Sequence, residues 1–335
     1  MKRSIYLAPV LLLLLLVTSC GVPNQDQGVT RTSYMLDTVI HITLYGGKEE
    51  ENEAILTQTM EEINRLEDLL SVEREGSDLD RLAKAAGREW VEISPECEEA
   101  LTQAKTYWAL SSGYFDVTTG PLIDLWHIRN GEGHYPTAEE LAMTLPLISS
   151  EDLLVEKGRA YLAREGMKAN LGAIAKGYIA DRVKVFLLDR GVEHALIDLG
   201  RNILLVGGRP NGGDFRIGVQ DPFHPEETSA RHVVKAVDKS LVTSGVYERY
   251  FEYEGVRYHH IMDPFTGFPA DRGVVSATII SDESAQGDAL STACLLLGPE
   301  EGLALIESIP GAEALLIGED GQEWFSSGFE TYLAD

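Results

Sequence analysis

The order of helical and strand patterns limits the fold more than any other feature of the sequence. Apolar residues at helical spacing run through 50–70, 94–113 and 173–190, and short apolar runs between turn residues dominate from residue 195 onwards. Two more helical patterns follow at 285–297 and 299–309. Strand and helix do not alternate regularly, so the sequence predicts an α+β fold with a largely antiparallel sheet, not a doubly wound nucleotide-binding fold.

The expected strands are short and bounded by turn residues. One of them, 35–45, is rich in β-branched residues, and Glu254 with Gly255 should form the turn of a hairpin. Thr137 and Glu140 have the spacing of a capping box and should begin a short helix. The remaining strands are expected at 195–206, 215–219, 241–243, 247–253, 256–261, 274–280, 314–317 and 323–326.

The N-terminus has the pattern of a secretion signal. Lys2 and Arg3 precede an apolar run over 5–17, which is too short to span a bilayer but suits a signal peptide. Small residues before Cys20 resemble a bacterial lipobox, although a plain secretory signal with an incidental cysteine gives the same pattern.

The lipobox reading divides the chain into three parts. It predicts a signal peptide over 1–19, a tether over 20–32 that follows the lipidated Cys20, and one catalytic domain over 33–335. The protein would then lie on the extracytoplasmic face of the cell membrane, held there by acyl chains and not by a spanning helix.

Charge and cysteine content exclude several classes of protein. With 28 Lys and Arg against 54 Asp and Glu, the net charge of −26 argues against non-specific binding to nucleic acid. The sequence has neither a GxGxxG after an early strand nor a GxxxxGK[ST] phosphate loop. Cys97 and Cys294 could pair in an oxidising compartment, but both lie in helical patterns, where buried free thiols are the stronger expectation.

Two clusters could bind an anion and a cation. Residues 170–177 (NLGAIAKG) form a small-residue turn that enters a helix, where free N–H groups and Lys176 suit a phosphate; a plain helix entry with a solvated lysine is the alternative. Asp288 and Thr292 share one helix face, and their oxygens are of the kind that Mg²⁺ or Ca²⁺ takes. A helix-dipole contact and a backbone-bonded threonine would explain the same pair without a metal.

Two further clusters lie at turns. His259 and His260 end a strand, and since neighbouring strand residues point to opposite faces, only one of them should face a given site. That histidine could be a general base or could cap the turn. Residues 113–121 combine aromatic side chains with a carboxylate and a Gly-Pro turn; the aromatic residues could stack on a planar ring or belong to the core.

Taken together, these clusters resemble the motifs of the ApbE family, the FAD:protein FMN transferases. The resemblance extends over about 33–335 and starts with Met35 near the first expected strand. It continues through 77–82 (SDLDRL), 115–122 (FDVTTGPL), 170–177, 243–249 (TSGVYER), 259–269 (HHIMDPFTGFP) and 287–292 (GDALST).

The resemblance implies an activity and roles for particular residues. Such enzymes use Mg²⁺ to transfer the FMN half of FAD to a Thr or Ser hydroxyl of a partner protein through a phosphoester bond, releasing AMP. His260 matches the residue that helps to deprotonate the acceptor, while Asp288, Thr292 and the carbonyl of Ala173 match the metal ligands. Residues at FAD-contacting positions are Met35, Tyr114, Phe115, Asp116, Asn170, Lys176 and Met262.

The implied partners are flavin-carrying redox proteins, such as Rnf- or Nqr-type subunits or FMN-binding domains, with a Ser/Thr-Gly-Ala-Ser/Thr-like motif. The chain departs from the family pattern at Asn170, where an Asp is usual, and at Val72 or Glu73, where an aromatic side chain tends to stack on the flavin. Gly287 replaces an Ala, a change expected to matter little. A Mg²⁺-dependent FAD pyrophosphatase and a lipoprotein that only binds flavin are the two alternatives.

Overall fold

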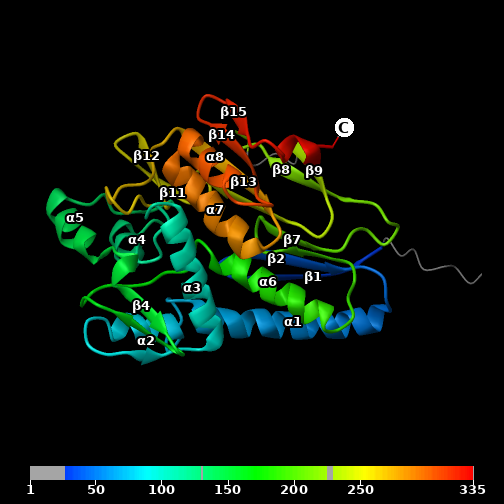
Figure 1. Cartoon of the computed structure of the whole chain (residues 1–335), viewed down its shortest axis with the longest axis horizontal. Coiled ribbons are helices and arrows are strands. Elements are labelled where there is room, and N and C mark those ends of the chain that lie inside the picture. Colours follow the sequence, from blue (N-terminus) through cyan, green and yellow to red (C-terminus); the bar gives the residue numbers. More distant parts are fainter. Residues whose placement is uncertain (1–26, 130, 225–228, 335) are drawn as a thin grey trace, which may run out of the picture.

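A computed structural model describes residues 27–129, 131–224 and 229–334. The predicted signal peptide over 1–19 and Cys20 lie outside these residues. The centre of the molecule is an eight-stranded sheet in which every neighbouring pair is antiparallel, so the predicted α+β class is confirmed (Figure 1). In spatial order its strands are β1 (Val29–Met35), β2 (Thr38–Leu44), β6 (Ala195–Asp198), β7 (Asn202–Val206), β10 (Ser240–Gly245), β13 (Val274–Ser281), β14 (Glu313–Gly318) and β15 (Glu323–Phe325).

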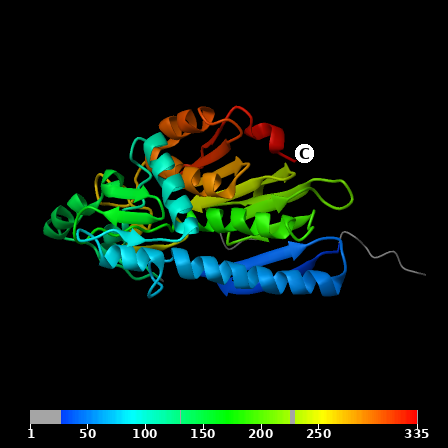
Figure 2. The ribbon, with the colours of Figure 1, turned by 60° about the horizontal axis from the view of Figure 1, so that its bottom comes forward.

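Helices cover the sheet and build the rest of the body. The long helix α1 runs beside β1 and β2, and α6 lies next to α7 (Figure 2). No helix among the described residues has the length and apolar content needed to cross a membrane. The helices are α1 (Glu49–Leu70), α2 (Asp78–Lys84), α3 (Pro95–Leu110), α4 (Gly120–Trp126), α5 (Ala138–Thr144), α6 (Ala175–Leu188), α7 (Ser284–Leu297) and α8 (Pro299–Glu307).

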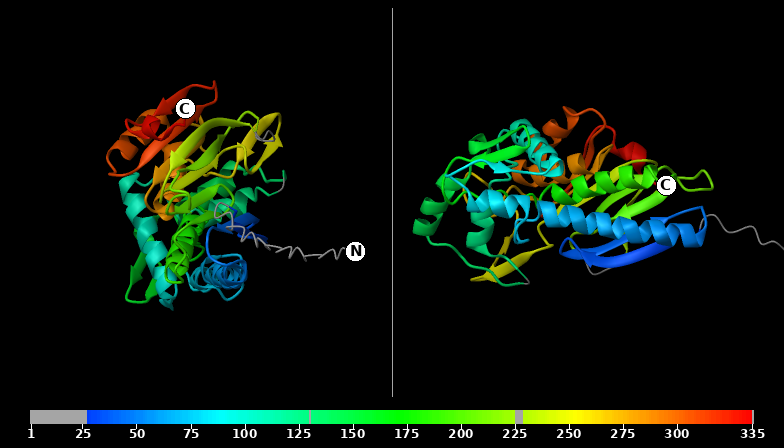
Figure 3. Two further views of the ribbon diagram at one scale, coloured as in Figure 1. Left: turned by 90° about the vertical axis from the view of Figure 1, so that its right-hand side faces the viewer. Right: turned by 90° about the horizontal axis from the view of Figure 1, so that it is seen from below.

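Three small antiparallel sheets and three short 3₁₀ turns complete the fold. The pair β8–β9 shares a hydrophobic cluster with β7, β10, β13 and β14 of the long sheet, and the pair β11–β12 stands at one end of the molecule (Figure 3). The small sheets are β3 (Val91–Glu92) with β5 (Arg159–Leu162) and β4 (Leu153–Glu156), β8 (Phe215–Gln220) with β9 (Ala230–Ala236), and β11 (Tyr250–Tyr253) with β12 (Val256–His259). The 3₁₀ turns are η1 (Leu145–Leu147), η2 (Ser150–Asp152) and η3 (Phe329–Tyr332).

Turns with positive φ angles change two of the expected strands. The strand predicted at 35–45 occurs as β2, but it begins only at Thr38, because Leu36 and Asp37 have positive φ angles of 55° and 56° and connect β2 to the unexpected strand β1. The run 195–206 is broken between β6 and β7, where Arg201 has φ 70°. Since β1 begins at Val29, the predicted tether over 20–32 is too long at its C-terminal end.

The close packing of α6 against α7 positions the residues that these two helices contribute to the cavity. A Cβ atom on Gly177 would lie 2.3 Å from the carbonyl oxygen of Ser284, so only glycine permits this approach. Asp181 of α6 accepts hydrogen bonds from the first amides of α7, Ser284 N–H at 2.7 Å and Ala285 N–H at 2.8 Å. These contacts set the register of the two helices, on which the candidate site depends.

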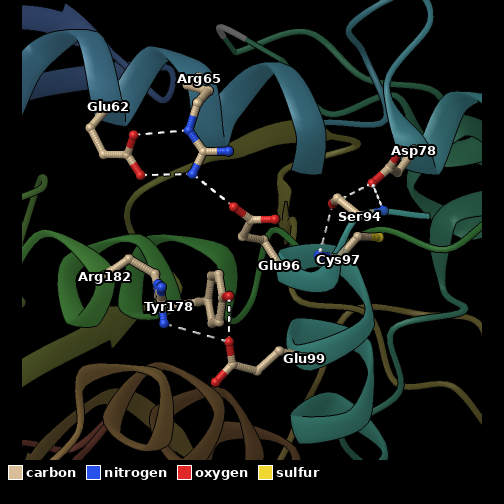
Figure 4. A network of polar contacts seen from close by, with 9 residues as sticks. All are labelled: Glu62, Arg65, Asp78, Ser94, Glu96, Cys97, Glu99, Tyr178 and Arg182. Atoms are coloured by element: carbon tan, nitrogen blue, oxygen red, sulfur yellow. Dashed lines mark hydrogen bonds and ion pairs between the residues drawn. The ribbon is translucent and has the colours of Figure 1, made fainter. Parts of the chain in front are cut away.

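Polar contacts join α1, α3 and α6 on the outer side (Figure 4). The Arg65 guanidinium contacts Glu62 at 2.7 Å and Glu96 of α3 at 2.8 Å, while the Tyr178 hydroxyl donates to Glu99 at 2.7 Å. Cys97, near this network, and Cys294 are buried free thiols, as their helical patterns predicted.

Candidate functional site

One large cavity contains nearly all the predicted site residues. Its volume is about 960 Å³, which suits a ligand of cofactor size. Met35 is the exception, because its side chain packs against the main core while the cavity wall is formed by its neighbours Tyr34 and Leu36. The predicted residues on the wall are Tyr114, Phe115, Asp116, Asn170, Ala173, Lys176, His260, Met262, Asp288 and Thr292.

Asp288 links the two helices at the cavity. Only 3% of its surface is exposed, and its Oδ2 accepts a hydrogen bond from Gly177 N–H at 3.0 Å. Its Oδ1 accepts no hydrogen bond from any described residue. One carboxylate oxygen therefore holds α6 in place while the other is available to a ligand.

The same contact frees a backbone carbonyl. In a regular helix Gly177 N–H would bond the carbonyl four residues earlier, that of Ala173, but here it donates to Asp288. No described residue donates a hydrogen bond to the Ala173 oxygen. Ala173, the free oxygen of Asp288 and Thr292, one turn later on α7, all line the cavity.

These three groups form a set of hard oxygen donors. The described residues contain no cluster of three His, Cys, Asp or Glu side chains that could hold a metal ion. A carboxylate, a hydroxyl and a backbone carbonyl instead fit Mg²⁺, which keeps further positions for water and phosphate oxygens.

The start of α6 brings a positive charge to the cavity wall. Lys176 is half-buried on the cavity wall and forms no ion pair with any described residue. The N-cap position, Ile174, offers no side-chain oxygen to the first turn. The N–H groups of Ala175 and Gly177 already donate, to the Leu171 carbonyl and to Asp288, so the helix dipole and the Lys176 ammonium group are what favour a bound anion here.

His260 faces the cavity with its ring orientation fixed. Its Nδ1 lies 3.1 Å from the carbonyl oxygen of Arg249, and since a carbonyl only accepts, the proton is on Nδ1. The lone pair of Nε2 is therefore free. Burial, together with the charges of Arg249 and Lys176, lowers the pKa of His260 to about 3, so the ring is neutral near pH 7.

His259 has a structural role instead. It is buried, and its Nε2 donates to the carbonyl of Ala270 at 2.8 Å while Nδ1 accepts from Ile261 N–H at 3.2 Å. Both ring nitrogens are used inside the protein, and His259 is not on the cavity wall. Only one of the two histidines faces the site, as the strand alternation predicted.

Asp116 and Asn170 shape the loops of the cavity. Asp116 Oδ1 accepts hydrogen bonds from both the amide and the hydroxyl of Thr118, and the carboxylate also bonds Ser150 at 2.8 and 3.0 Å. Asn170 Oδ1 accepts from Gly172 N–H at 2.7 Å, which leaves its NH₂ group for a ligand. The amide therefore performs the turn-forming role that an aspartate oxygen would have at this position.

The wall next to Val72 and Glu73 is charged. Glu73 pairs with Arg129 at 3.1 Å and lies 3.8 Å from the Lys168 ammonium. Aromatic side chains reach the cavity elsewhere, and Tyr114 among them is held by Phe265 at a ring distance of 5.0 Å and by Arg272 at 3.1 Å.

The structure corrects one expectation and adds two residues. An alanine Cβ at 287 would lie 2.9 Å from Val242 Cγ2, so Gly287 matters for how closely α7 approaches β10, contrary to what the sequence suggested. Gly177, which donates to Asp288, and Arg249, which orients His260, were not assigned roles from the sequence. Arg249 ends the TSGVYER motif, but nothing in that motif indicates that its carbonyl would be the partner.

Comparison with known proteins decides the family. The family model described as "ApbE family" matches residues 36–316. The chain belongs to the ApbE family. An ApbE relative from Treponema pallidum (strain Nichols), named FAD:protein FMN transferase, is 34% identical over 330 residues, covering 93% of this chain and 90% of its own. A protein of the same name from Klebsiella pneumoniae (strain 342) is 35% identical and covers 79% of this chain and 83% of its own.

Solved structures of ApbE proteins share the fold. The crystal structure of the ApbE protein from Thermotoga maritima matches with a TM-score of 0.84 and 30% identity, covering 92% of this chain and 100% of that one. The flavin transferase ApbE from Vibrio cholerae matches with a TM-score of 0.82 and 28% identity, over 92% and 99% of the two chains. The ApbE-like fold predicted from the motifs is therefore confirmed.

Proposed function

We propose that this protein transfers the FMN half of FAD to a hydroxyl group of another protein and releases AMP. The observation that carries the proposal is the content of one cavity in an ApbE-family chain. An anion-binding helix start, a set of oxygen donors and a histidine with a free Nε2 all line it. Relatives that cover most of the chain carry the name FAD:protein FMN transferase.

FAD would bind with its pyrophosphate at the start of α6. The Lys176 ammonium group and the helix dipole would neutralise phosphate charge, and the Asn170 NH₂ group offers a donor to a ribose or adenine atom. Tyr114, Met262 and the backbone near Phe115 and Asp116 would contact the rings. Met35 supports this wall from behind through Tyr34 and Leu36.

Asp288, Thr292 and the carbonyl of Ala173 would hold Mg²⁺. The free Oδ1 of Asp288 and the unpaired oxygen of Ala173 fit this role, because both belong to residues on the cavity wall and oxygen atoms are the ligands that Mg²⁺ prefers. When bound, the ion would neutralise charge on the pyrophosphate as its bridging bond breaks.

His260 would act as the general base. Its Nε2 takes the proton of the acceptor hydroxyl while the hydroxyl oxygen attacks the phosphorus of the FMN half. A phosphoester bond forms, the bond to the AMP phosphate breaks, and the proton passes to the leaving AMP. A bound anionic substrate offsets the positive charges of Arg249 and Lys176, which raises the pKa of His260 and strengthens it as a base.

The protein would act outside the cytoplasm. The signal-peptide pattern over 1–19 and the lipobox cysteine Cys20 support a lipid anchor on the outer side of the cell membrane. Acceptors there would be flavin-carrying redox proteins of the Rnf or Nqr type, or FMN-binding domains, with a Ser/Thr-Gly-Ala-Ser/Thr-like motif.

A single reaction distinguishes the candidate activities. The domain from residue 27 onwards is incubated with FAD, Mg²⁺ and an Nqr-type acceptor domain, and flavin fluorescence of the denatured acceptor and AMP release are both measured. Covalent fluorescence with AMP supports transfer. AMP with free FMN and no labelled acceptor indicates a pyrophosphatase, and bound FAD without either product indicates a flavin carrier.

A further inference from the structure

The hairpin β11–β12 begins directly beside His260. His260 N–H donates to the carbonyl of Arg249 at 3.1 Å. The adjacent residue pair, Tyr250 with His259, is the first pair of the hairpin. Arg249, Tyr250 and His260 all line the cavity. The hairpin therefore leads from the proposed base out to the protein surface.

The register shows which main-chain groups of β11 are unused. In an antiparallel pair, residues that bond each other alternate with residues whose N–H and C=O groups point away from the partner strand. Because Arg249 and His260 bond each other, the next bonded pair is Phe251 with Tyr258. The N–H and C=O groups of Tyr250 and Glu252 therefore point outward, and no described residue bonds them.

One face of β11 is packed against aromatic side chains, and part of the strand is exposed to solvent. Phe251 is buried against Trp126, with ring centroids 6.3 Å apart, and Tyr253 stacks on Tyr135 at 4.7 Å. Glu252 is exposed to solvent, and 42% of the Tyr253 surface is exposed. A short strand fixed on one face, with free groups along one edge, is a template for another strand.

The other strand edge near the cavity is covered. β1 also reaches the wall through Tyr34, but α1 lies along it: Arg31 pairs with Glu53 and donates to Thr57, and Leu36 N–H donates to Glu67 at 3.4 Å (Figure 2). The outer edge of β12 contributes no residue to the cavity wall.

We propose that the acceptor protein docks as an added strand on the free edge of β11. The occupant is the extended segment of the acceptor that carries the modified hydroxyl, and its path along β11 from Glu252 past Tyr250 leads to the cavity that Tyr250 and His260 both line. Main-chain hydrogen bonds to β11 would hold the segment independently of its side chains, while the cavity would accept only the side chain that carries the hydroxyl. This inference rests on the proposed transfer activity, since it describes how the acceptor reaches that site.

The test removes one main-chain donor from the edge. Glu252→Pro deletes an N–H that bonds nothing in the protein, at a position where an edge strand tolerates proline. Glu252→Ala is the matched control, because it loses the same side chain and keeps the N–H. With the Nqr-type acceptor domain as probe, the proline variant should raise KM for the acceptor about tenfold relative to the alanine variant. KM for FAD should stay the same in both.

Hydrogen exchange on the unmodified enzyme gives an independent readout. An acceptor domain with its target threonine replaced by alanine should protect the amides of Tyr250 and Glu252 when FAD is bound. Equal KM values for the two Glu252 variants, or protection on β1 in place of β11, would overturn the docking mode. If the unmodified enzyme transfers no FMN at all, the proposed function fails first, so the two failures are distinguishable.

Discussion

Asp288 should serve the reaction and the fold through different oxygen atoms, and two substitutions separate these roles. Asp288→Asn keeps an oxygen that can accept from Gly177 N–H but removes the negative charge. Asp288→Ala removes both. Because Asp288 is 3% exposed and the Gly177 bond is 3.0 Å long, alanine leaves a buried N–H group without an acceptor.

The size of the difference follows from that contact. An unsatisfied buried amide costs about 1–3 kcal/mol, so the alanine variant should have a free energy of unfolding lower by that amount than the asparagine variant. Both variants lose the charged oxygen proposed for the metal. Turnover in Mg²⁺ should therefore fall at least about 100-fold in each, because a charge that stabilises the transition state is worth several kcal/mol.

Urea unfolding in EDTA measures the first effect, and AMP release in Mg²⁺ measures the second. Added Mg²⁺ should also raise the unfolding midpoint of the unmodified protein and leave both variants unchanged. Full activity of Asp288→Asn would refute the metal assignment. Equal unfolding midpoints for the two variants would show that the bond to Gly177 contributes nothing to stability.

Four further outcomes are expected. His260→Gln should slow FMN transfer about 100-fold or more with the Kd for FAD within about twofold, as single-turnover kinetics and flavin titration would show; a raised Kd with normal transfer contradicts the base role. Lys176→Met should weaken FAD binding about tenfold at low salt and reduce its salt dependence, and an unchanged titration curve argues against the anion site. Gly287→Ala should cost about 1–3 kcal/mol of stability in urea, because its Cβ would lie 2.9 Å from Val242 Cγ2. Burial lowers the pKa of His260 to about 3 in the folded protein, so the unfolded chain binds this proton more readily. The free energy of unfolding should therefore decrease as the pH drops from about 6.5 towards 3, and His260→Gln should make that decrease smaller in urea unfolding at each pH.

Local patterns in the sequence predicted much of the fold. The capping box of Thr137 with Glu140, the helix that precedes Gly191 and the turn at Glu254–Gly255 all occur as expected, because neighbouring residues determine each of them. The turn at Leu36 and Asp37 carries no glycine signal, so the strand was expected to begin at residue 35 and β1 was not expected. The strands β4 and β5 were not expected, since few of their residues are apolar and buried.

The site was predictable as a set of residues and not as a geometry. Motif resemblance identified Lys176, Asp288 and His260, and the structure brings them to one cavity. The contacts that define their chemistry cross long stretches of chain: Gly177 meets Asp288 over 111 positions. Spacing along a single sequence carries no information about such a contact, because it depends on how α6 and α7 pack.

The mass of the intact acceptor after reaction tests the central claim most directly. The enzyme, FAD, Mg²⁺ and an Nqr-type acceptor domain are incubated together. The mass of the intact acceptor is then measured by mass spectrometry and compared with that of a version whose target threonine is replaced by alanine. The proposed function predicts a gain of one FMN less one water on the unmodified acceptor, with AMP released in equal amount and no gain on the alanine version. An acceptor of unchanged mass, with FMN and AMP accumulating free in solution, would contradict the account.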